Sequence, residues 1–333
     1  MTSSRRILVT GGCGFIGSHV VRRLLRDTQH TVTNLDKLTY AGNPANLRDV
    51  ENDPRYTFVQ GCITDQTLVA SLICESNAIL HLAAETHVDR SIGDAAPFMQ
   101  TNVVGTQTLL DALRHAPDGT SKPFVQVSTD EVFGDLPIDR PDLRFNEESP
   151  VRPRSPYAAS KAAGDLLGIA YHTTFGLDVR VTNGSNAYGP NQFPEKLIPS
   201  FITRLIDGKS VPLYGDGLNI RDWLHVEDHA SAILAVLDHG RSGRRYCIGG
   251  QHERSNLTLT RDLLAIMGRD ETAIEYVADR PGHDRRYALD HARLRDELGW
   301  SPTHTDWQAS LTATVRWYED HPQWWRPLLQ QSC

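Results

Sequence analysis

A glycine-rich turn near the amino terminus constrains the fold more than any other part of this sequence. Its glycines are Gly11, Gly14 and Gly17, and they separate an apolar run at residues 7–10 from an amphipathic run at residues 14–26. The first run is typical of a buried strand and the second of a helix with one apolar face. Glycine at these positions permits a tight turn, close approach of the backbone to a pyrophosphate, and close packing of helix on strand. The amino terminus of the helix then offers free N–H groups to phosphates.

Strand and helix patterns continue to alternate through the first half of the chain. Further strand patterns lie at residues 31–35, 56–60, 78–82 and 124–128, with a helical pattern at residues 102–114. This alternation predicts an α/β fold with a Rossmann-type doubly wound parallel sheet. After residue 185 prolines punctuate the chain, which predicts a smaller mixed α/β lobe at the carboxyl end. We expect a cofactor-binding domain at residues 1–185 and a substrate-binding lobe at residues 186–333, interleaved so that parts of the late chain return to the first domain.

Asp36 follows the second strand pattern and indicates which dinucleotide the turn would bind. A carboxylate at that place accepts hydrogen bonds from the ribose hydroxyls of NAD and repels the 2′-phosphate of NADP. The alternative is a glycine-rich turn that binds nothing. Because the glycines and the carboxylate occur together between the expected elements, the sequence predicts bound NAD.

Composition argues against several other classes of protein. The 333 residues carry a formal net charge of −7, whereas a nucleic-acid binder usually shows a basic face. No segment approaches the roughly 18 apolar residues that span a bilayer, and the start runs directly into a strand pattern. The cysteines show no pair spacing and no metal-ligand spacing with histidine. We therefore expect a cytoplasmic protein with reduced thiols, no metal, no membrane contact and no nucleic-acid partner. The five cysteines are Cys13, Cys62, Cys74, Cys247 and Cys333.

Tyr157 and Lys161 stand four residues apart at the start of a helical pattern, residues 157–175. That spacing places both side chains on one helix face. An ammonium beside a phenol favours the phenolate, so we expect Lys161 to lower the pKa of Tyr157. Such a tyrosine can accept a proton from a substrate hydroxyl during oxidation. The same spacing also occurs on ordinary helix surfaces, and its meaning here comes from the dinucleotide turn upstream.

Thr129, Asp130 and Glu131 directly follow the strand pattern at residues 124–128. Open α/β sheets bind ligands at the carboxyl ends of their strands. If the backbone stays extended, the two carboxylates point to different sides and can address different substrate atoms. Neighbouring like charges raise the pKa of one carboxyl, which favours an unequally shared proton. The alternative is a solvated acidic loop.

This combination resembles the nucleotide-sugar 4,6-dehydratases of the extended short-chain dehydrogenase/reductase superfamily, in particular those acting on dTDP-glucose. The resemblance rests on Thr-Asp-Glu after the strand, on the later Tyr-x-x-x-Lys, and on stretches that cover nearly the whole chain. The further matching stretches are residues 35–43, 81–92, 193–199, 214–217, 219–223 and 279–287.

The resemblance implies a lyase that makes a 4-keto-6-deoxy sugar and regenerates NAD within each turnover. Tyr157 would take the proton of the sugar 4-hydroxyl while Thr129 holds that oxygen and NAD accepts the C4 hydride. Glu131 would remove the C5 proton, and Asp130 would protonate the departing 6-hydroxyl. The hydride would then return to C6.

The resemblance also implies binding residues around this centre. The expected cofactor set is Gly11, Gly14, Phe15, Ile16, Gly17, Asp36, Lys37, Thr39, Gly42, Cys62, Ile63, Leu82, Ala83, Ala84, Thr101, Tyr157 and Lys161. The expected set for the nucleotide-diphosphate sugar is Glu85, His87, Thr129, Asn186, Glu195, Lys196, Leu197, Pro212, Tyr214, Asn219, Arg221, Arg280, His283 and Tyr287. Arginine suits bidentate phosphate binding, although each residue alone could equally form a surface ion pair.

The two helical patterns at residues 102–114 and 157–175 carry long apolar stripes. The resemblance implies that they form a four-helix interface in a homodimer, and the alternative is packing within one chain. Five positions depart from the family pattern and leave cofactor retention and the identity of the nucleotide and sugar open. They are Cys62, Phe133, Gly184, Ala187 and Cys247.

Three rival functions remain open at this point. The same chemistry could act on UDP-glucose or UDP-N-acetylglucosamine, because one methyl group changes affinity by only about 1–3 kcal/mol. A nucleotide-sugar 4-epimerase needs only reversible C4 oxidation, so it has no use for the pair Asp130 and Glu131. A non-catalytic NAD-binding regulator would not need the intact Tyr157 and Lys161.

Overall fold

Strands within residues 6–184, together with the later strand at residues 245–248, form a seven-stranded parallel sheet in the computed structural model, which describes residues 4–279 and 282–330. The spatial order is β10-β6-β5-β4-β1-β2-β3, and every neighbouring pair runs parallel. Strand order reverses between β1 and β4, the switch point at which doubly wound sheets bind ligands. The strands are β1 (Arg6–Thr10), β2 (Thr31–Asp36), β3 (Tyr56–Gln60), β4 (Ala78–His81), β5 (Phe124–Thr129), β6 (Val179–Gly184) and β10 (Arg245–Ile248).

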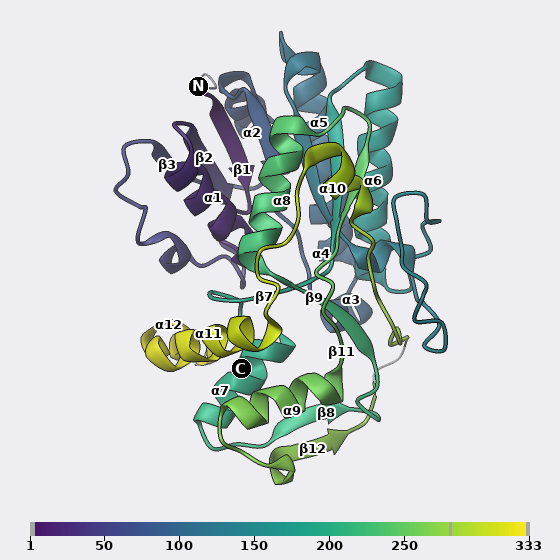
Figure 1. Cartoon of the computed structure of the whole chain (residues 1–333). Coiled ribbons are helices and arrows are strands. Elements are labelled where there is room, and N and C mark those ends of the chain that lie inside the picture. The colour runs from purple at the N-terminus through teal and green to yellow at the C-terminus, as the bar shows by residue number, and fades with distance from the viewer. Residues whose placement is uncertain (1–3, 280–281, 331–333) are drawn as a thin grey trace.

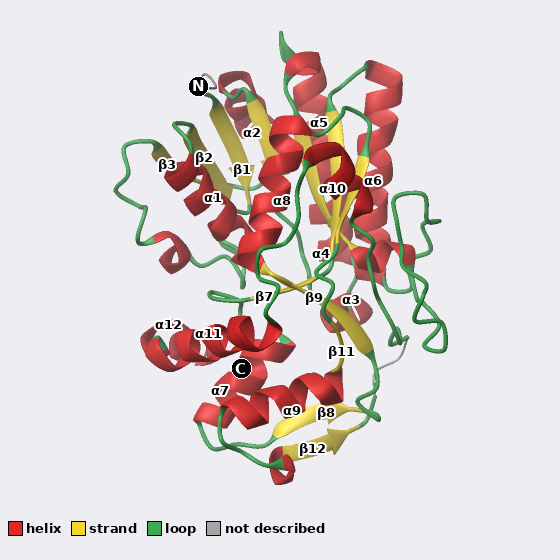
Figure 2. Cartoon of the chain, in the orientation of Figure 1, coloured by secondary structure: helices red, strands yellow, loops and turns green. Residues whose placement is uncertain are grey.

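Helices cover both faces of this sheet (Figures 1 and 2). Successive residues of β1 face opposite ways: Ile7 and Val9 join the apolar cluster under α1 and α8, whereas Leu8 joins the cluster under α2, α5 and α6. The fold class expected from the sequence is thereby confirmed. The helices are α1 (Phe15–Asp27), α8 (Val226–His239) and α10 (Ala292–Leu298) on one face, and α2 (Gln66–Glu75), α5 (Thr106–His115) and α6 (Pro156–Phe175) on the other.

A smaller lobe lies beyond the carboxyl ends of the strands, in the lower half of Figure 1. Its apolar core includes Phe201, Leu259, Trp307 and Trp325, contributed by four helices. Its strands form a parallel pair, β8 with β12, and a three-stranded sheet in the order β11-β9-β7. The elements are β7 (Asn186–Tyr188), α7 (Leu197–Ile206), β8 (Val211–Tyr214), β9 (Ile220–His225), β11 (Glu253–Ser255), α9 (Asn256–Ile266), β12 (Ile274–Val277), α11 (Trp307–Asp320) and α12 (Pro322–Gln330).

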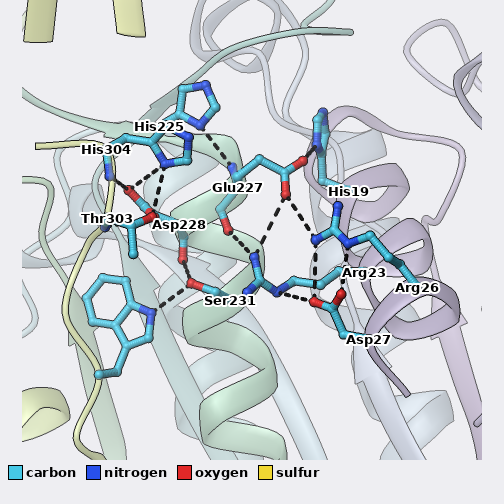
Figure 3. A network of polar contacts seen from close by, with 11 residues as sticks. His19, Arg23, Arg26, Asp27, His225, Glu227, Asp228, Ser231, Thr303 and His304 are labelled. Atoms are coloured by element: carbon cyan, nitrogen blue, oxygen red, sulfur yellow. Dashed lines mark hydrogen bonds and ion pairs between the residues drawn. The ribbon is translucent and has the colours of Figure 1, made fainter. Parts of the chain in front are cut away.

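Helix α8 connects the two parts, because β9 of the small lobe leads directly into it and β10 then joins the large sheet. Figure 3 shows the polar contacts along its first turns. Glu227 pairs with His19 of α1, and Asp228 accepts hydrogen bonds from the backbone N–H groups of Thr303 and His304 at 3.0 and 2.9 Å. The contact between Glu227 and His19 holds the first turns of α1 and α8 side by side, and the Asp228 hydrogen bonds hold the segment at residues 303–304 against α8.

The helix expected at residues 102–114 has a more complex start than its sequence pattern indicates. It runs from α4 (Ala96–Phe98) through a π-helical segment, η2 (Met99–Gly105), into α5. Within η2, the Asn102 side chain exchanges hydrogen bonds with the backbone of Glu85 at 2.9 and 3.0 Å. Wide helical turns of this kind are frequent at functional sites. Shorter elements are η1 (Pro44–Leu47), α3 (Val88–Gly93), η3 (Gly119–Ser121), η4 (Asp130–Phe133) and η5 (Glu271–Ala273).

None of the helices in residues 4–279 and 282–330 is long and apolar enough to cross a membrane. The same residues contain no group of three or more histidine, cysteine or acidic side chains placed to hold a metal ion.

Candidate active site

A cavity of about 330 Å³ lies at the carboxyl ends of the parallel strands, a volume in the range of small-molecule sites. Its walls come from both parts of the chain. Every residue of the expected cofactor set lines it: Gly11, Gly14, Phe15, Ile16, Gly17, Asp36, Lys37, Thr39, Gly42, Cys62, Ile63, Leu82, Ala83, Ala84, Thr101, Tyr157 and Lys161. The structure therefore brings together side chains that are spread over half the sequence.

The glycine-rich turn forms a bare floor for this cavity. Gly11 has φ +75°, and a Cβ there would lie 2.6 Å from the backbone nitrogen of Ala83. A Cβ on Gly17 would lie 2.1 Å from the carbonyl oxygen of Gly11. Helix α1 starts behind the turn with Gly14 as its N-cap and no side-chain cap, so its first N–H groups are open to an anion. This geometry fits the pyrophosphate of a dinucleotide.

Asp36 ends β2 at one side of the turn. Its carboxylate accepts hydrogen bonds from the backbone N–H groups of Cys13 at 2.9 Å and Leu38 at 2.8 Å. Burial raises its pKa, and these two hydrogen bonds oppose the rise. Each carboxylate oxygen can accept a further bond, so Asp36 can also receive ribose hydroxyls.

The backbone after Thr129 does not stay extended, so the expected alternation of Asp130 and Glu131 is wrong. Strand β5 ends at Thr129, and the chain turns at once into the 3₁₀ helix η4. The Thr129 hydroxyl caps this turn by accepting from the N–H of Glu131 at 3.3 Å. The turn buries Asp130, which is 1% exposed, while Glu131 is partly exposed; both line the cavity.

Asp130 has the surroundings of a carboxylic acid that keeps its proton. Burial raises its pKa well above the ordinary value, and the charges of Glu131 and Asp222 raise it further. Its Oδ1 accepts a hydrogen bond from Thr129 Oγ1 at 3.1 Å. Its Oδ2 is buried and has no hydrogen-bond partner within the described part of the chain. A proton on Oδ2 could therefore be donated to a ligand in the cavity.

Tyr157 and Lys161 lie one turn apart on α6, which Ser155 caps by accepting from Ala158 N–H. Both are nearly buried, and Lys161 Nζ donates to the Val127 carbonyl at 2.7 Å. The expected lowering of the Tyr157 pKa is not seen. Burial raises this pKa well above its ordinary value, and the charge of Glu131 adds to the rise. The spacing along the helix therefore does not determine the pKa of Tyr157; burial has the largest effect on it.

The expected substrate residues fall into two groups. Glu85, Thr129, Asn186, Glu195 and Lys196 line the cavity. His87 does not line it, but its Nε2 lies 3.7 Å from Glu195 Oε2.

The second group lies in the small lobe, outside the cavity lining. The Arg221 guanidinium stacks over the Tyr287 ring at 4.4 Å, and Arg221 and Asn219 both donate to the Asp284 carbonyl. The remaining members outside the cavity lining are Leu197, Pro212, Tyr214 and His283, and the Tyr214 and His283 rings meet edge to face at 6.4 Å. Arg280, like Cys333, lies outside the described residues.

The positions that depart from the family pattern lie either in the cavity wall or in an apolar cluster. Cys62 lines the cavity with its Sγ 3.1 Å from Thr64 Oγ1, and Ala187 also lines it. Phe133 and Cys247 pack in the same apolar cluster. Phe133 and Cys247 are thus two neighbouring departures from the family pattern, and both side chains are buried among apolar residues.

Other cavity residues were not found from the sequence. Trp324 of α12 lines the wall, and its Nε1 donates to Asn46 Oδ1 at 2.9 Å; no local pattern links these distant residues. Asp165 does not line the cavity but lies behind it, and the sequence indicates it, because it continues the four-residue spacing from Tyr157 and Lys161. It is fully buried, and its charge raises the pKa of Lys161 against the larger effect of burial.

Comparison with known proteins places this geometry among related enzymes. A family described as GDP-mannose 4,6 dehydratase matches residues 8–308. A dTDP-glucose 4,6-dehydratase from Streptomyces griseus is 55% identical over 327 residues, covering 97% of each chain. The structure of a dTDP-glucose 4,6-dehydratase from Streptomyces venezuelae, solved with NAD and TYD bound, superimposes with a TM-score of 0.93 at 51% identity, covering 97% of this chain and 99% of the other. A UDP-glucuronic acid 4-epimerase from Bacillus cereus superimposes at 0.87 with 27% identity, covering 95% and 99% of the two chains.

Replacing Asp130 by Asn is expected to stabilise the folded protein at neutral pH. A carboxyl whose pKa is raised on folding costs stability once the pH exceeds its ordinary pKa of 3.8, because only the unfolded chain then ionises freely. Asn removes that cost, so the variant should have a higher free energy of unfolding than wild type above pH 3.8, and the difference should vanish below it. Urea unfolding of both proteins at several pH values measures the difference.

The matched control is Asp222→Asn. Burial raises the pKa of Asp222 as well, but its two oxygens accept hydrogen bonds from the N–H groups of Gly250 and His252, and an amide has only one acceptor oxygen, so the lost hydrogen bond outweighs the gain. This variant should lose about 1–3 kcal/mol at neutral pH. A folded Asp130→Asn protein that is less stable than wild type at pH 7 would contradict the assignment of a protonated Asp130.

Proposed function

The chain belongs to the dTDP-glucose 4,6-dehydratase family, and we propose that it converts dTDP-glucose to dTDP-4-keto-6-deoxyglucose by transient oxidation at C4 and loss of water across C5 and C6. It is an NAD-dependent nucleotide-sugar hydro-lyase. The observation that carries this proposal is the pair Asp130 and Glu131, a buried acid and a partly exposed carboxylate, in one cavity with Tyr157 and the dinucleotide turn.

NAD is the cofactor that fits the cavity, since the turn leaves no side chain in the way of a pyrophosphate and Asp36 can accept the ribose hydroxyls. When bound, NAD accepts a hydride from C4 of the sugar and returns it to C6, and its oxidised ring is positively charged. Gly11 and Gly17 would hold the diphosphate, while Thr101 and Ile63 lie along the wall of the same cavity.

Tyr157 acts as the base toward the sugar 4-hydroxyl. Burial raises the pKa of Tyr157, so the phenolate that this role needs would be favoured only once positive charge, such as that of an oxidised nicotinamide, lies beside it. Thr129 holds the same substrate oxygen by a hydrogen bond. Lys161 keeps its place through the Val127 carbonyl and supplies positive charge beside the phenol. These residues produce a 4-ketone.

Asp130 and Glu131 carry out the elimination. The 4-ketone makes the C5 proton acidic, and Glu131 removes it. Asp130 gives its proton to the 6-hydroxyl as the C6–O bond breaks, so one water leaves and the C5–C6 double bond forms. The two carboxyls differ in burial, which separates an acid from a base at one pH.

The small lobe binds the nucleotide diphosphate of the substrate in this proposal. Arg221, Asn219 and Lys196 bind the phosphates by hydrogen bonds, and Tyr214 stacks on the pyrimidine. The boundary near residue 185 then separates a cofactor part from a nucleotide-sugar part, with α8 and β10 returning to the first sheet.

The rival functions have less support. A 4-epimerase shares the fold, but it has no use for a protonated carboxyl beside C6. A UDP-sugar dehydratase would use the same centre, whereas relatives of about 50% identity act on dTDP-glucose by name. An NAD-binding regulator would not need four buried or partly buried acid–base groups in one cavity.

The protein works as a homodimer in this proposal, through the helices that the sequence singled out. Large apolar side chains are exposed on this pair: Met99 is 47% and Val104 40% exposed on η2, and Leu166 is 56% exposed on α6. Exposed apolar patches mark interaction surfaces, and α5 and α6 pack side by side as half of a four-helix bundle would. A cytoplasmic location fits the four described cysteines, which are all free thiols.

Asp130→Asn and Tyr157→Phe should fail at different steps. Asp130→Asn should lower formation of the dehydrated product by about 10²–10⁴-fold, because proton donation to the leaving hydroxyl is lost. It should still oxidise C4, so borodeuteride reduction of a quenched single turnover traps a labelled hexose. Tyr157→Phe should give neither product nor trapped ketone.

The control for both is Asp142→Asn, an exposed carboxylate paired with Arg140, which should behave as wild type. Mass spectrometry measures all species. Full dehydration at the wild-type rate by Asp130→Asn would exclude the assigned acid.

Leu166→Glu should weaken the dimer by at least about tenfold, because a charge would be buried at an apolar interface. Tyr276→Glu, at a side chain 57% exposed on β12, is the matched control and should leave the dimer intact. Sedimentation velocity over a concentration series gives the dissociation constants. A wild-type monomer at all concentrations would refute the interface.

A further inference from the structure

His229 is a buried polar side chain that the reaction described above does not use. It lies in the first turns of α8, is 2% exposed and lines the cavity. Neither ring nitrogen has a hydrogen-bond partner among residues 4–279 and 282–330. Leaving a buried donor and a buried acceptor without partners destabilises the folded protein. A histidine that served packing alone would be an unfavourable choice at this place.

Gly184, at the end of β6, makes room for this ring. A Cβ on Gly184 would lie 2.5 Å from His229 Cε1 and 2.6 Å from Nε2, distances that side chains do not adopt. Any other residue at 184 would therefore displace the imidazole. Gly184 is also one of the positions where the chain departs from the family pattern. The glycine at position 184 and the position of the His229 ring therefore depend on each other.

The place of this contact in the cavity indicates which part of a ligand it meets. Helix α8 covers one face of β5 and β6, and α6 with Tyr157 and Lys161 covers the other. Asp36, which is expected to accept the ribose hydroxyls, ends β2, and Cys62 of the cofactor set follows β3 at the far edge of the sheet. The redox-active ring of a dinucleotide must lie near Tyr157. His229 and Gly184 therefore flank the redox end of the cavity.

We propose that His229 is a positioning residue for the nicotinamide end of the cofactor, hydrogen-bonded to its carboxamide, and that Gly184 provides the space for the imidazole. The inference rests on the proposed use of NAD. A neutral imidazole has one donor and one acceptor nitrogen, and a carboxamide offers both an acceptor oxygen and a donor nitrogen. The pair is chemically complementary.

The charge state of the ring agrees with this role. Burial lowers the pKa of His229 to about 4, so the imidazole is neutral at physiological pH. A neutral ring does not repel the positive charge of an oxidised nicotinamide. It remains able to hold the same carboxamide after reduction.

The test compares cofactor release from three purified holoenzymes with that of wild type. The variants are His229→Ala, Gly184→Ala and the double variant. NAD release is followed after dilution into an excess of an NAD-consuming hydrolase, and the emission spectrum of bound NADH reports on the carboxamide environment. Each single variant should release NAD about tenfold faster, as the loss of about 1.4 kcal/mol predicts, and should shift the NADH emission. The double variant should release it no faster than His229→Ala, because both changes remove one contact.

His291→Ala is the matched control. His291 is 4% exposed and its Nδ1 also lacks a partner among the described residues, but it does not line the cavity. It should leave NAD release unchanged even if the melting temperature falls.

Two outcomes would overturn the inference alone: wild-type release and emission in His229→Ala, or additive effects in the double variant, while wild type still dehydrates dTDP-glucose. A wild-type protein that holds no NAD and has no dehydratase activity would overturn the proposed function as well. Release is measured without substrate, so the two failures are distinguishable.

Discussion

The close approach of Gly17 to Gly11 is the constraint on which the rest of the molecule depends. A single added Cβ at Gly17 would stand 2.1 Å from the Gly11 carbonyl, so strand, turn and helix can meet only through glycine. That contact sets the start of α1 over the end of β1. It also brings the adjoining ends of β2, β4 and β5 around one bare patch of backbone, where a diphosphate can lie.

Burial at the strand ends then determines the chemistry. The same desolvation that raises the pKa of Asp130 and of Tyr157 lowers that of Lys161 and of His229. An acid that retains its proton is what the loss of water requires at Asp130, whereas Tyr157 must give up its proton against the effect of burial before it can act as a base. Burial in the cavity wall thus determines which of these polar groups carry a proton.

The sequence predicts the sheet and the cofactor cavity well, because both follow from local patterns. The strands expected at residues 56–60 and 124–128 have nearly those bounds in β3 and β5, and the glycine spacing locates the turn. The turn after Thr129 was missed, since a 3₁₀ helix of four residues has no periodic signature. The pKa of Tyr157 was expected to move the other way, because spacing along a helix reports neighbours but not burial. Trp324 and His229 reach the cavity only through tertiary packing, which no local pattern encodes.

The most direct test of the central claim follows one hydrogen through the reaction. The protein is incubated with dTDP-glucose that carries deuterium at C4, mixed with unlabelled substrate, and the product is examined by mass spectrometry and NMR. Internal oxidation and return predict a 4-keto-6-deoxy product with deuterium at C6 and no exchange of label between molecules. Recovery of a C4 epimer with no loss of water, or a dehydrated product without deuterium at C6, would contradict the account.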